Sequence, residues 1–106
     1  MVKRFDVYLV SLDPESSTDP KNTRPGVVIS PDEANLHLPT VLVAPLSSTR
    51  AGYPTRVPVE FLNDSRFVIL DQIRSIDNKR LVKKIGEIDT AAQKVLLDRL
   101  AEYFAN

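Results

Sequence analysis

The chain opens with an alternation of apolar and polar residues that is typical of a β-strand. Within residues 4–13, Phe5, Val7 and Leu9 occupy alternate positions, and the apolar residues then change phase. Because successive side chains of a strand point to opposite faces, this pattern predicts a strand with one apolar face. The change of phase predicts a bend or bulge near Leu9–Val10.

Further strand patterns follow along the chain. They cover residues 24–30, 40–46, 56–61 and 66–71, with 72–77 prolonging the last and 81–88 returning as a short strand or helical turn. The stretch 40–46 is almost entirely apolar, which predicts a central strand. Pro58 cannot donate a ladder hydrogen bond, so 56–61 is expected at an edge of the sheet.

A short helical turn is predicted between the second and third of these strands. Ser30 can cap it, Pro31 suits its first position and Glu33 completes a capping box. His37 follows between two leucines, where we expect a packed residue at a strand end rather than a catalyst.

A longer helix closes the chain, and residues 90–93 fit a capping box at its start. Its apolar positions are Val95, Leu96, Leu97, Leu100, Tyr103 and Phe104. This face is broader than a helix on a small sheet needs. Either part of it meets a second subunit or all of it belongs to the core.

Two polar loops, residues 14–23 and 47–54, connect the predicted strands. The first is long for a hairpin connection, so it is either a functional loop or a solvated one without a role. Many short strands and one terminal helix predict a mainly β, barrel-like fold with a C-terminal α-helix. With no linker or repeat in the sequence, residues 1–106 are expected to form one domain.

The composition of the chain excludes only a few classes of function. The 106 residues are 42% hydrophobic and 26% charged, which is ordinary for a globular protein and argues against disorder. Fourteen Lys and Arg balance fourteen Asp and Glu, so only an uneven distribution of charge could favour nucleic acid. One histidine and no cysteine exclude most zinc sites and any disulfide. The sequence has no signal-peptide pattern and no apolar run of spanning length, so we expect a cytoplasmic protein without membrane contact.

The stretch Thr23–Ser30 is the most informative for chemistry. Pro25 fixes its own φ and holds Arg24 in an extended backbone, so the guanidinium projects from a stiff strand entrance. Gly26 has no Cβ and lets another backbone or a ligand approach. Such an arginine suits a phosphate or a carboxylate. The alternative is an ordinary surface ion pair.

Arginines, hydroxyls and amides gather at the other predicted strand ends. They are Ser47, Ser48, Thr49, Arg50, Arg56, Asp71, Gln72 and Arg74. Guanidinium groups can neutralise a phosphorane, and a hydroxyl can bond the same oxygens, so this set favours a phosphodiester over an acyl group. If the substrate is RNA, its own 2′-hydroxyl can be the nucleophile, and neither a metal nor a cofactor is needed. The same residues are also common on any surface.

Four ordered blocks resemble the MazF/PemK-type toxins of type II toxin–antitoxin systems. They are Phe5–Val10 with Leu12–Pro14, Thr23–Ser30, Val43–Ser48 with Gly52–Pro54, and Val68–Asp77 with Arg80–Leu81. The resemblance implies an SH3-like barrel that forms a homodimer and cuts single-stranded RNA at short sequences without metal. It also implies a cognate antitoxin whose disordered, often acidic tail occupies the RNA groove. DNA would be contacted only indirectly, through that antitoxin.

The resemblance also implies roles for individual residues. Arg24 takes the position of the arginine that acts on the phosphate, and Ser47 that of its usual threonine partner. Phe5 departs from the family's glycine. The residues expected to bind RNA are Ser48, Thr49, Arg50, Tyr53, Arg56, Gln72 and Arg74. Tyr53 could instead be a packing residue, and the arginines could serve an antitoxin tail as readily as RNA.

Two other functions are compatible with the same residues. The related CcdB-type toxins use the same barrel to poison a topoisomerase and cut nothing. A catalytically weak relative could bind its antitoxin and act only in regulation, which the serine at position 47 would favour.

Overall fold

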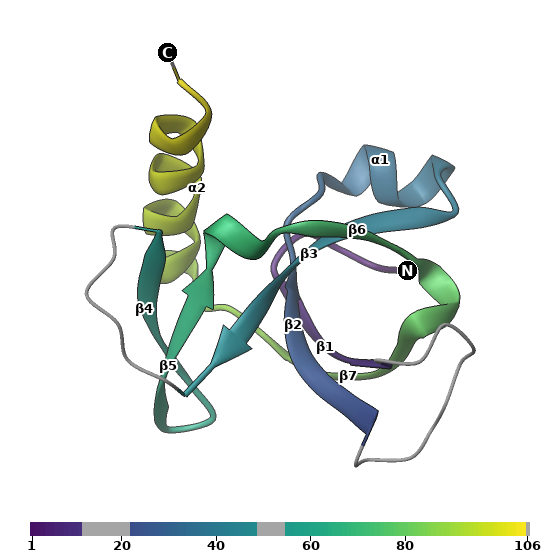
Figure 1. Cartoon of the computed structure of the whole chain (residues 1–106), viewed down its shortest axis with the longest axis horizontal. Coiled ribbons are helices and arrows are strands. Elements are labelled where there is room, and N and C mark those ends of the chain that lie inside the picture. Colours follow the sequence, from purple (N-terminus) through teal and green to yellow (C-terminus); the bar gives the residue numbers. More distant parts are fainter. Residues whose placement is uncertain (12–21, 49–54, 106) are drawn as a thin grey trace.

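The computed structural model describes residues 1–11, 22–48 and 55–105 (Figure 1). The strands are β1 (Asp6–Ser11), β2 (Thr23–Val28), β3 (Thr40–Ser47), β4 (Arg56–Phe61), β5 (Asp64–Ile69), β6 (Arg74–Asp77) and β7 (Leu81–Glu87). The α-helices are α1 (Asp32–His37) and α2 (Thr90–Phe104), and the short 3₁₀ turns are η2 (Leu70–Gln72) and η3 (Asn78–Arg80). A mainly β fold with a C-terminal helix was predicted, and it is confirmed.

The strands form one curled, antiparallel sheet in the order β4-β5-β3-β2-β1-β7, with β6 paired to β3. In Figure 1, strands β1, β2, β3, β6 and β7 form a ring, while β4 and β5 continue the sheet to one side. The apolar stretch 40–46 is the central strand, as predicted, because β3 pairs with three other strands. Strand β4 lies at the edge, as Pro58 indicates.

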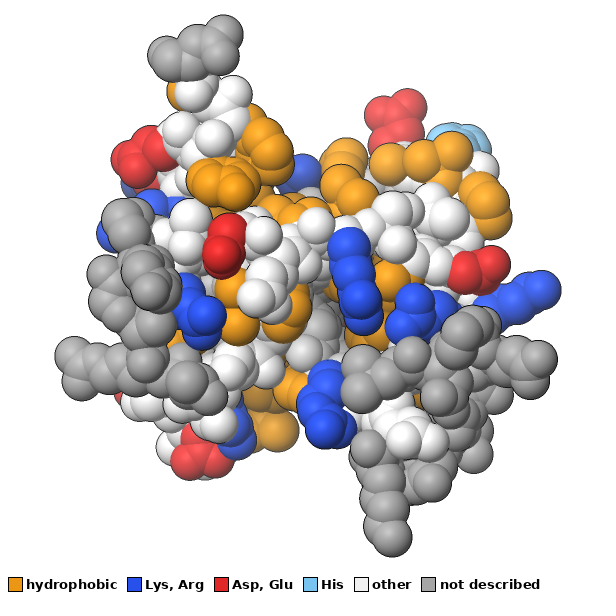
Figure 2. Space-filling model, in the orientation of Figure 1, with side chains coloured by type: hydrophobic (Ala, Val, Ile, Leu, Met, Phe, Trp, Pro, Cys, Tyr) orange, Lys and Arg blue, Asp and Glu red, His pale blue; other side chains and the backbone are white. Residues whose placement is uncertain are grey.

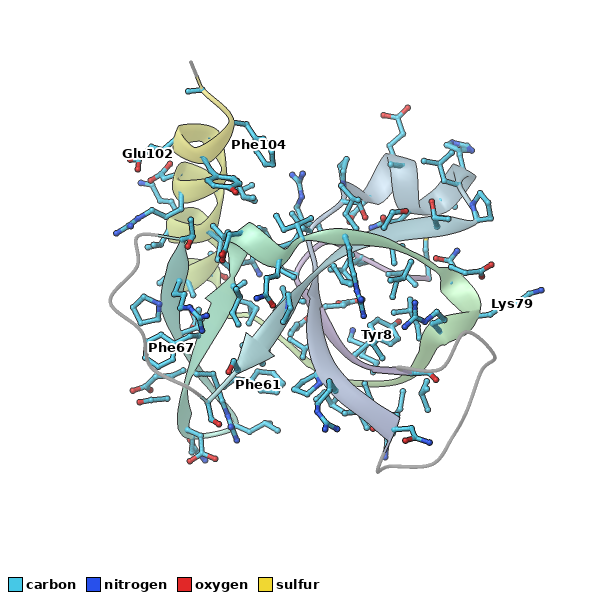
Figure 3. The ribbon with its side chains drawn as sticks, viewed as in Figure 1. Tyr8, Phe61, Phe67, Lys79, Glu102 and Phe104 are labelled. Carbon is cyan, nitrogen blue, oxygen red and sulfur yellow. The ribbon has the colours of Figure 1, made fainter. Side chains whose placement is uncertain are left out.

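Two apolar clusters lie on opposite faces of the curled sheet. The larger one includes Val27, Ala44 and Leu46, and α2 covers it through the fully buried Leu96. The smaller one comprises Val10, Val28, Val41, Val43 and Ile76, and Tyr8, which packs against it, lies inside the ring of strands (Figure 3). Adjacent residues of β2 therefore serve different clusters, which is why this strand is apolar on both faces.

The predicted irregularity in the first strand is confirmed. The register of β1 against β7 shifts between Leu9 and Val10, and again between Val7 and Tyr8. Gly86 lies opposite Val7, and a Cβ at Gly86 would come within 2.8 Å of the Phe61 ring. Glycine is therefore required where the bulged pair closes over the larger cluster.

Both predicted helix caps are wrong. Ser30 does not cap α1; its hydroxyl donates to Asn35 Oδ1 and accepts from the backbone N–H of Leu42, so it ties the helix to β3. The cap of α2 is Asp89, whose carboxylate accepts from the Ala92 N–H at 2.8 Å, one residue before the predicted Thr90.

The expectation for His37 is also wrong, because this residue ends α1 and is exposed rather than packed. Within the described ranges, neither α-helix has the length and apolar character needed to cross a membrane. The predicted loops lie largely outside the described residues, at 12–21 and 49–54.

Candidate functional site

Arg24 is the second residue of β2, close to the start of that strand. It pairs with Val10 of β1, while Gly26 pairs with Pro45 of β3. The Arg24 side chain is exposed, and its Nη1 donates to the Thr23 carbonyl oxygen at 2.8 Å. A Cβ at Gly26 would lie 3.2 Å from Val10, so glycine lets the strands approach closely beside the arginine.

Two hollows adjoin this arginine. The first, of about 410 Å³, is lined by Val10, Arg24, Pro25, Gly26, Val43, Pro45, Gln72 and Arg74. The second, of about 380 Å³, is lined by Arg24, Pro25, Pro45, Leu46, Ser47, Ser48, Arg66 and Ile69. Arg24, Pro25 and Pro45 line both hollows and so form the ridge between them. Figure 2 shows separate basic side chains around the hollowed middle of this face, with most of the acidic ones nearer its outline.

The sheet brings the polar residues of each hollow together from distant parts of the chain. Arg74 enters the first hollow because it pairs with Val43 of β3, and Gln72 precedes it at the end of η2. Both side chains are exposed. A hollow with apolar walls, an amide and two guanidinium groups can hold a flat ring and bond its polar edge.

Ser47 ends β3 in the second hollow, where it lies opposite Phe67 of β5. Ser48 follows it and is exposed. The second hollow thus combines hydroxyls with the guanidinium of Arg24, and this combination can bind the oxygens of a phosphate.

Arg56 was also predicted at the site, and it is not among the described residues that line either hollow. Arg56 pairs with Ile69, so the two side chains share a face of the sheet. Of the two, only Ile69 lines the second hollow. Thr49, Arg50 and Tyr53 lie outside the described residues.

Sequence reasoning missed Arg66, which lines the second hollow together with Arg24 and both serines. Its local pattern is that of any exposed strand position. Only the pairing of β3 with β5, which joins segments about twenty residues apart, places Arg66 beside the end of β3.

A second missed feature is the ion pair of Lys84 with Asp6, which joins β7 to β1. The Nζ of Lys84 lies 3.2 Å from Oδ1 of Asp6, whose exposed fraction is 1%. The hydrogen bond to Asp6, and then the charge of that carboxylate, raise the pKa of Lys84. Burial, followed by the charge of Asp6, raises the pKa of Tyr8. Figure 3 shows Tyr8 inside the ring of strands.

In the described part of the chain, no three His, Asp or Glu side chains come together in a way that could hold a metal ion. The polar side chains that line the two hollows carry guanidinium, amide and hydroxyl groups.

A curled antiparallel sheet that presents arginines and hydroxyls around two adjoining hollows defines a small, barrel-like class of protein. Residues 3–104 match the family described as the PemK-like, MazF-like toxin of type II toxin–antitoxin systems. The chain belongs to this family, as its sequence blocks predicted.

Similar proteins agree with this assignment. The chain is 37% identical over 91 residues to the endoribonuclease MazF of Staphylococcus epidermidis. The aligned region covers 80% of this chain and 76% of that protein. A mycobacterial endoribonuclease solved in complex with its cognate antitoxin has a TM-score of 0.81 at 23% identity, covering 96% of this chain and 93% of that one. A MazE–MazF structure from Deinococcus radiodurans has a TM-score of 0.79 at 21% identity, and the match covers 98% of this chain and 95% of that one. The predicted fold class is thereby confirmed.

Proposed function

We propose that this chain is a toxin endoribonuclease that cuts single-stranded RNA at short sequences without a metal ion. Its family consists of toxins, and a relative with 37% identity is named an endoribonuclease. The observation that carries the chemical part of the proposal is the position of Arg24, which borders both hollows and shares one of them with the Ser47 hydroxyl.

Cleavage would use the 2′-hydroxyl of the RNA itself. Its oxygen attacks the adjacent phosphorus, the bond to the 5′-oxygen of the next nucleotide breaks, and the products carry a 2′,3′-cyclic phosphate and a 5′-hydroxyl. One proton leaves the 2′-hydroxyl and one reaches the departing 5′-oxygen, so the reaction needs no oxidant or other reactant.

Arg24 would stabilise the crowded phosphorane in this reaction. Its guanidinium offers several N–H donors to the non-bridging oxygens and keeps its proton, so it acts as an electrostatic stabiliser rather than as the proton donor. Ser47 would orient the same phosphate through its hydroxyl.

The flanking nucleotides would occupy the remaining polar positions. Gln72 and Arg74 line the first hollow and Ser48 the second, so we assign them to RNA binding, together with Arg56, which pairs with Ile69 of the second lining. We also keep the sequence-based proposal that Thr49, Arg50 and Tyr53 contact RNA.

We further propose a homodimer and an antitoxin as protein partners. The outer part of α2 extends beyond the sheet, and Phe104 at its end is 71% exposed (Figures 1 and 3). Val95, Leu97 and Tyr103 are exposed as well, so an apolar surface is available to a second copy. An acidic antitoxin tail would suit the arginines around the hollows. The protein would then act on cytoplasmic mRNA and approach DNA only through its antitoxin.

The test is incubation of the purified protein with a long single-stranded RNA in EDTA, followed by mapping of both fragment ends. Cuts at one short sequence, with 2′,3′-cyclic phosphate and 5′-hydroxyl ends, would support the proposal. RNA that stays intact, or that is cut only when Mg²⁺ is restored, would contradict it. A matched oligonucleotide with 2′-deoxyribose at the cut position should resist cleavage, because it lacks the nucleophile.

A further inference from the structure

Arg66 occupies the same hollow as Arg24, Ser47 and Ser48. It comes from β5, and the antiparallel pairing explains its position, because Ser47 lies opposite Phe67. One step further along this register brings Ser48 level with Arg66. The lining of this hollow therefore combines the two hydroxyls at the end of β3 with guanidinium groups from two different strands.

Within the chain, Arg66 has an acidic neighbour that a ligand can replace. Its Nη2 lies 3.4 Å from Oδ2 of Asp64, and the side chains are 36% and 67% exposed. Exposed ion pairs of this kind add little to stability. Since a guanidinium suits phosphate as well as carboxylate, a phosphate oxygen can take the place of the Asp64 carboxylate.

We propose that Arg66 binds a phosphate of the RNA next to the one that Arg24 contacts, and that Asp64 holds its guanidinium when no RNA is bound. This inference rests on the proposed function. Two arginines that share one hollow with the serines would hold successive phosphates and so fix the path of the RNA strand across the hollow. A chain with a formal net charge of zero has no general attraction for RNA, so cations at the site have to supply it locally.

The measurement is equilibrium binding of a single-stranded oligonucleotide that carries 2′-deoxyribose at the mapped cut position. Arg66→Ala should weaken binding about tenfold at low salt, the size expected for a lost charge-assisted hydrogen bond. The slope of log K against log [salt] should become smaller in magnitude by about 0.7, the value for one phosphate contact on a single strand. Arg66→Lys keeps the charge and should restore most of the slope. Asp64→Asn should bind more tightly, by up to about fivefold.

Lys79→Ala is the matched control for loss of one positive charge. Figure 3 shows Lys79 pointing away from η3, across the molecule from Phe67 on β5, and its removal should leave the slope unchanged. Thermal unfolding establishes that each variant is folded. Parent-like affinity and slope in folded Arg66→Ala would overturn the inference. If that variant does not fold, unchanged binding by Asp64→Asn and a reduced slope in Arg66→Lys would overturn it instead.

Failure of the proposed function can be told apart from failure of this inference. If the parent cuts no RNA, the same titration is made with a long single-stranded RNA. A salt slope that Arg66→Ala reduces would then support the phosphate contact even though cleavage had failed. A slope that does not change, or no binding by the parent, would overturn the contact.

Discussion

The neighbours of Arg24 determine what its guanidinium can reach. Pro25 fixes the backbone, and the Thr23 carbonyl accepts a hydrogen bond from Nη1, so the side chain rests over its own strand beside both hollows. When RNA binds, phosphate oxygens can accept from the same nitrogen. The charged group is thus ordered at the site before substrate arrives, which reduces the entropy lost on binding.

Position 47 allows a direct test at the residue scale. Ser47 lines a hollow, so Ser47→Thr adds its methyl group where there is space. The β-branched side chain has fewer χ1 rotamers, so the hydroxyl should be oriented more of the time and the single-turnover cleavage rate should rise about threefold. The matched variant Ser47→Val has the shape of the threonine variant but no hydroxyl, and it should lose activity. A rate that falls in Ser47→Thr, or stays high in Ser47→Val, would remove the role assigned to this hydroxyl.

The cap of α2 is a prediction at the scale of elements. Asp89→Ala removes the acceptor of the Ala92 N–H and should lower the free energy of unfolding by about 1 kcal/mol. For a chain of this size that corresponds to a fall in Tm of about 4–8 °C. Thr90→Ala is the control, because the Thr90 side chain is exposed and does not cap the helix, and it should change Tm little. Equal losses in the two variants would argue against the assigned cap.

The pairing of β1 with β7 should depend on alkaline pH. The folded pKa values of Lys84 and Tyr8 lie above their ordinary values of 10.5 and 10.0. Their contribution to stability is therefore complete below about pH 10 and is lost as pH rises through the folded values. In urea unfolding, the contribution of these two groups to the free energy of unfolding should be constant near neutral pH. It should decline above about pH 10.

Lys84→Met should lower stability at neutral pH, because it leaves Asp6 buried without its cation, and it should flatten the alkaline decline. Lys83→Met, at the exposed position next to it, is the control and should keep the parent profile. An alkaline decline of the same size in Lys84→Met and the parent would contradict the role of the ion pair.

Many of the strands could be predicted because they depend on the local pattern of apolar and polar residues. The alternation in β1, the apolar run in β3 and the proline in β4 each indicated a strand and its place in the sheet. The caps could not be predicted in the same way. Ser30 could have capped α1, but its hydroxyl is bonded to Asn35 and Leu42 instead. At α2, Asp89 and Thr90 are adjacent residues that can both cap, and it is Asp89 that accepts from the Ala92 N–H.

The site was predictable to the extent that its residues stand at strand ends. Arg24, Ser47, Gln72 and Arg74 were expected together, and the two hollows bring them together. Arg66 was not expected, because its place depends on the register between two strands that no single stretch of sequence determines. Roles in RNA binding remain proposals for all of these residues.

At the scale of the whole molecule, the outer face of α2 predicts self-association. Phe104→Asp would place a charge in the exposed apolar surface without disturbing the buried Leu96. Light scattering coupled to size-exclusion chromatography should give a dimer for the parent and a shift towards monomer for the variant. Leu36→Asp, on the exposed surface of α1, is the control and should remain dimeric. A parent that is monomeric at high concentration would contradict the proposed dimer.

The central claim is that Arg24 stabilises the transition state of RNA cleavage. The most direct measurement compares the single-turnover cleavage rates of the parent and Arg24→Ala in EDTA, on RNA containing the mapped sequence, with folding and oligomeric state verified for both. Loss of a preorganised electrostatic group predicts a rate at least about 100-fold lower, at unchanged Tm, since the Arg24 side chain is exposed. A folded Arg24→Ala that cuts the same sequence as fast as the parent would contradict the account.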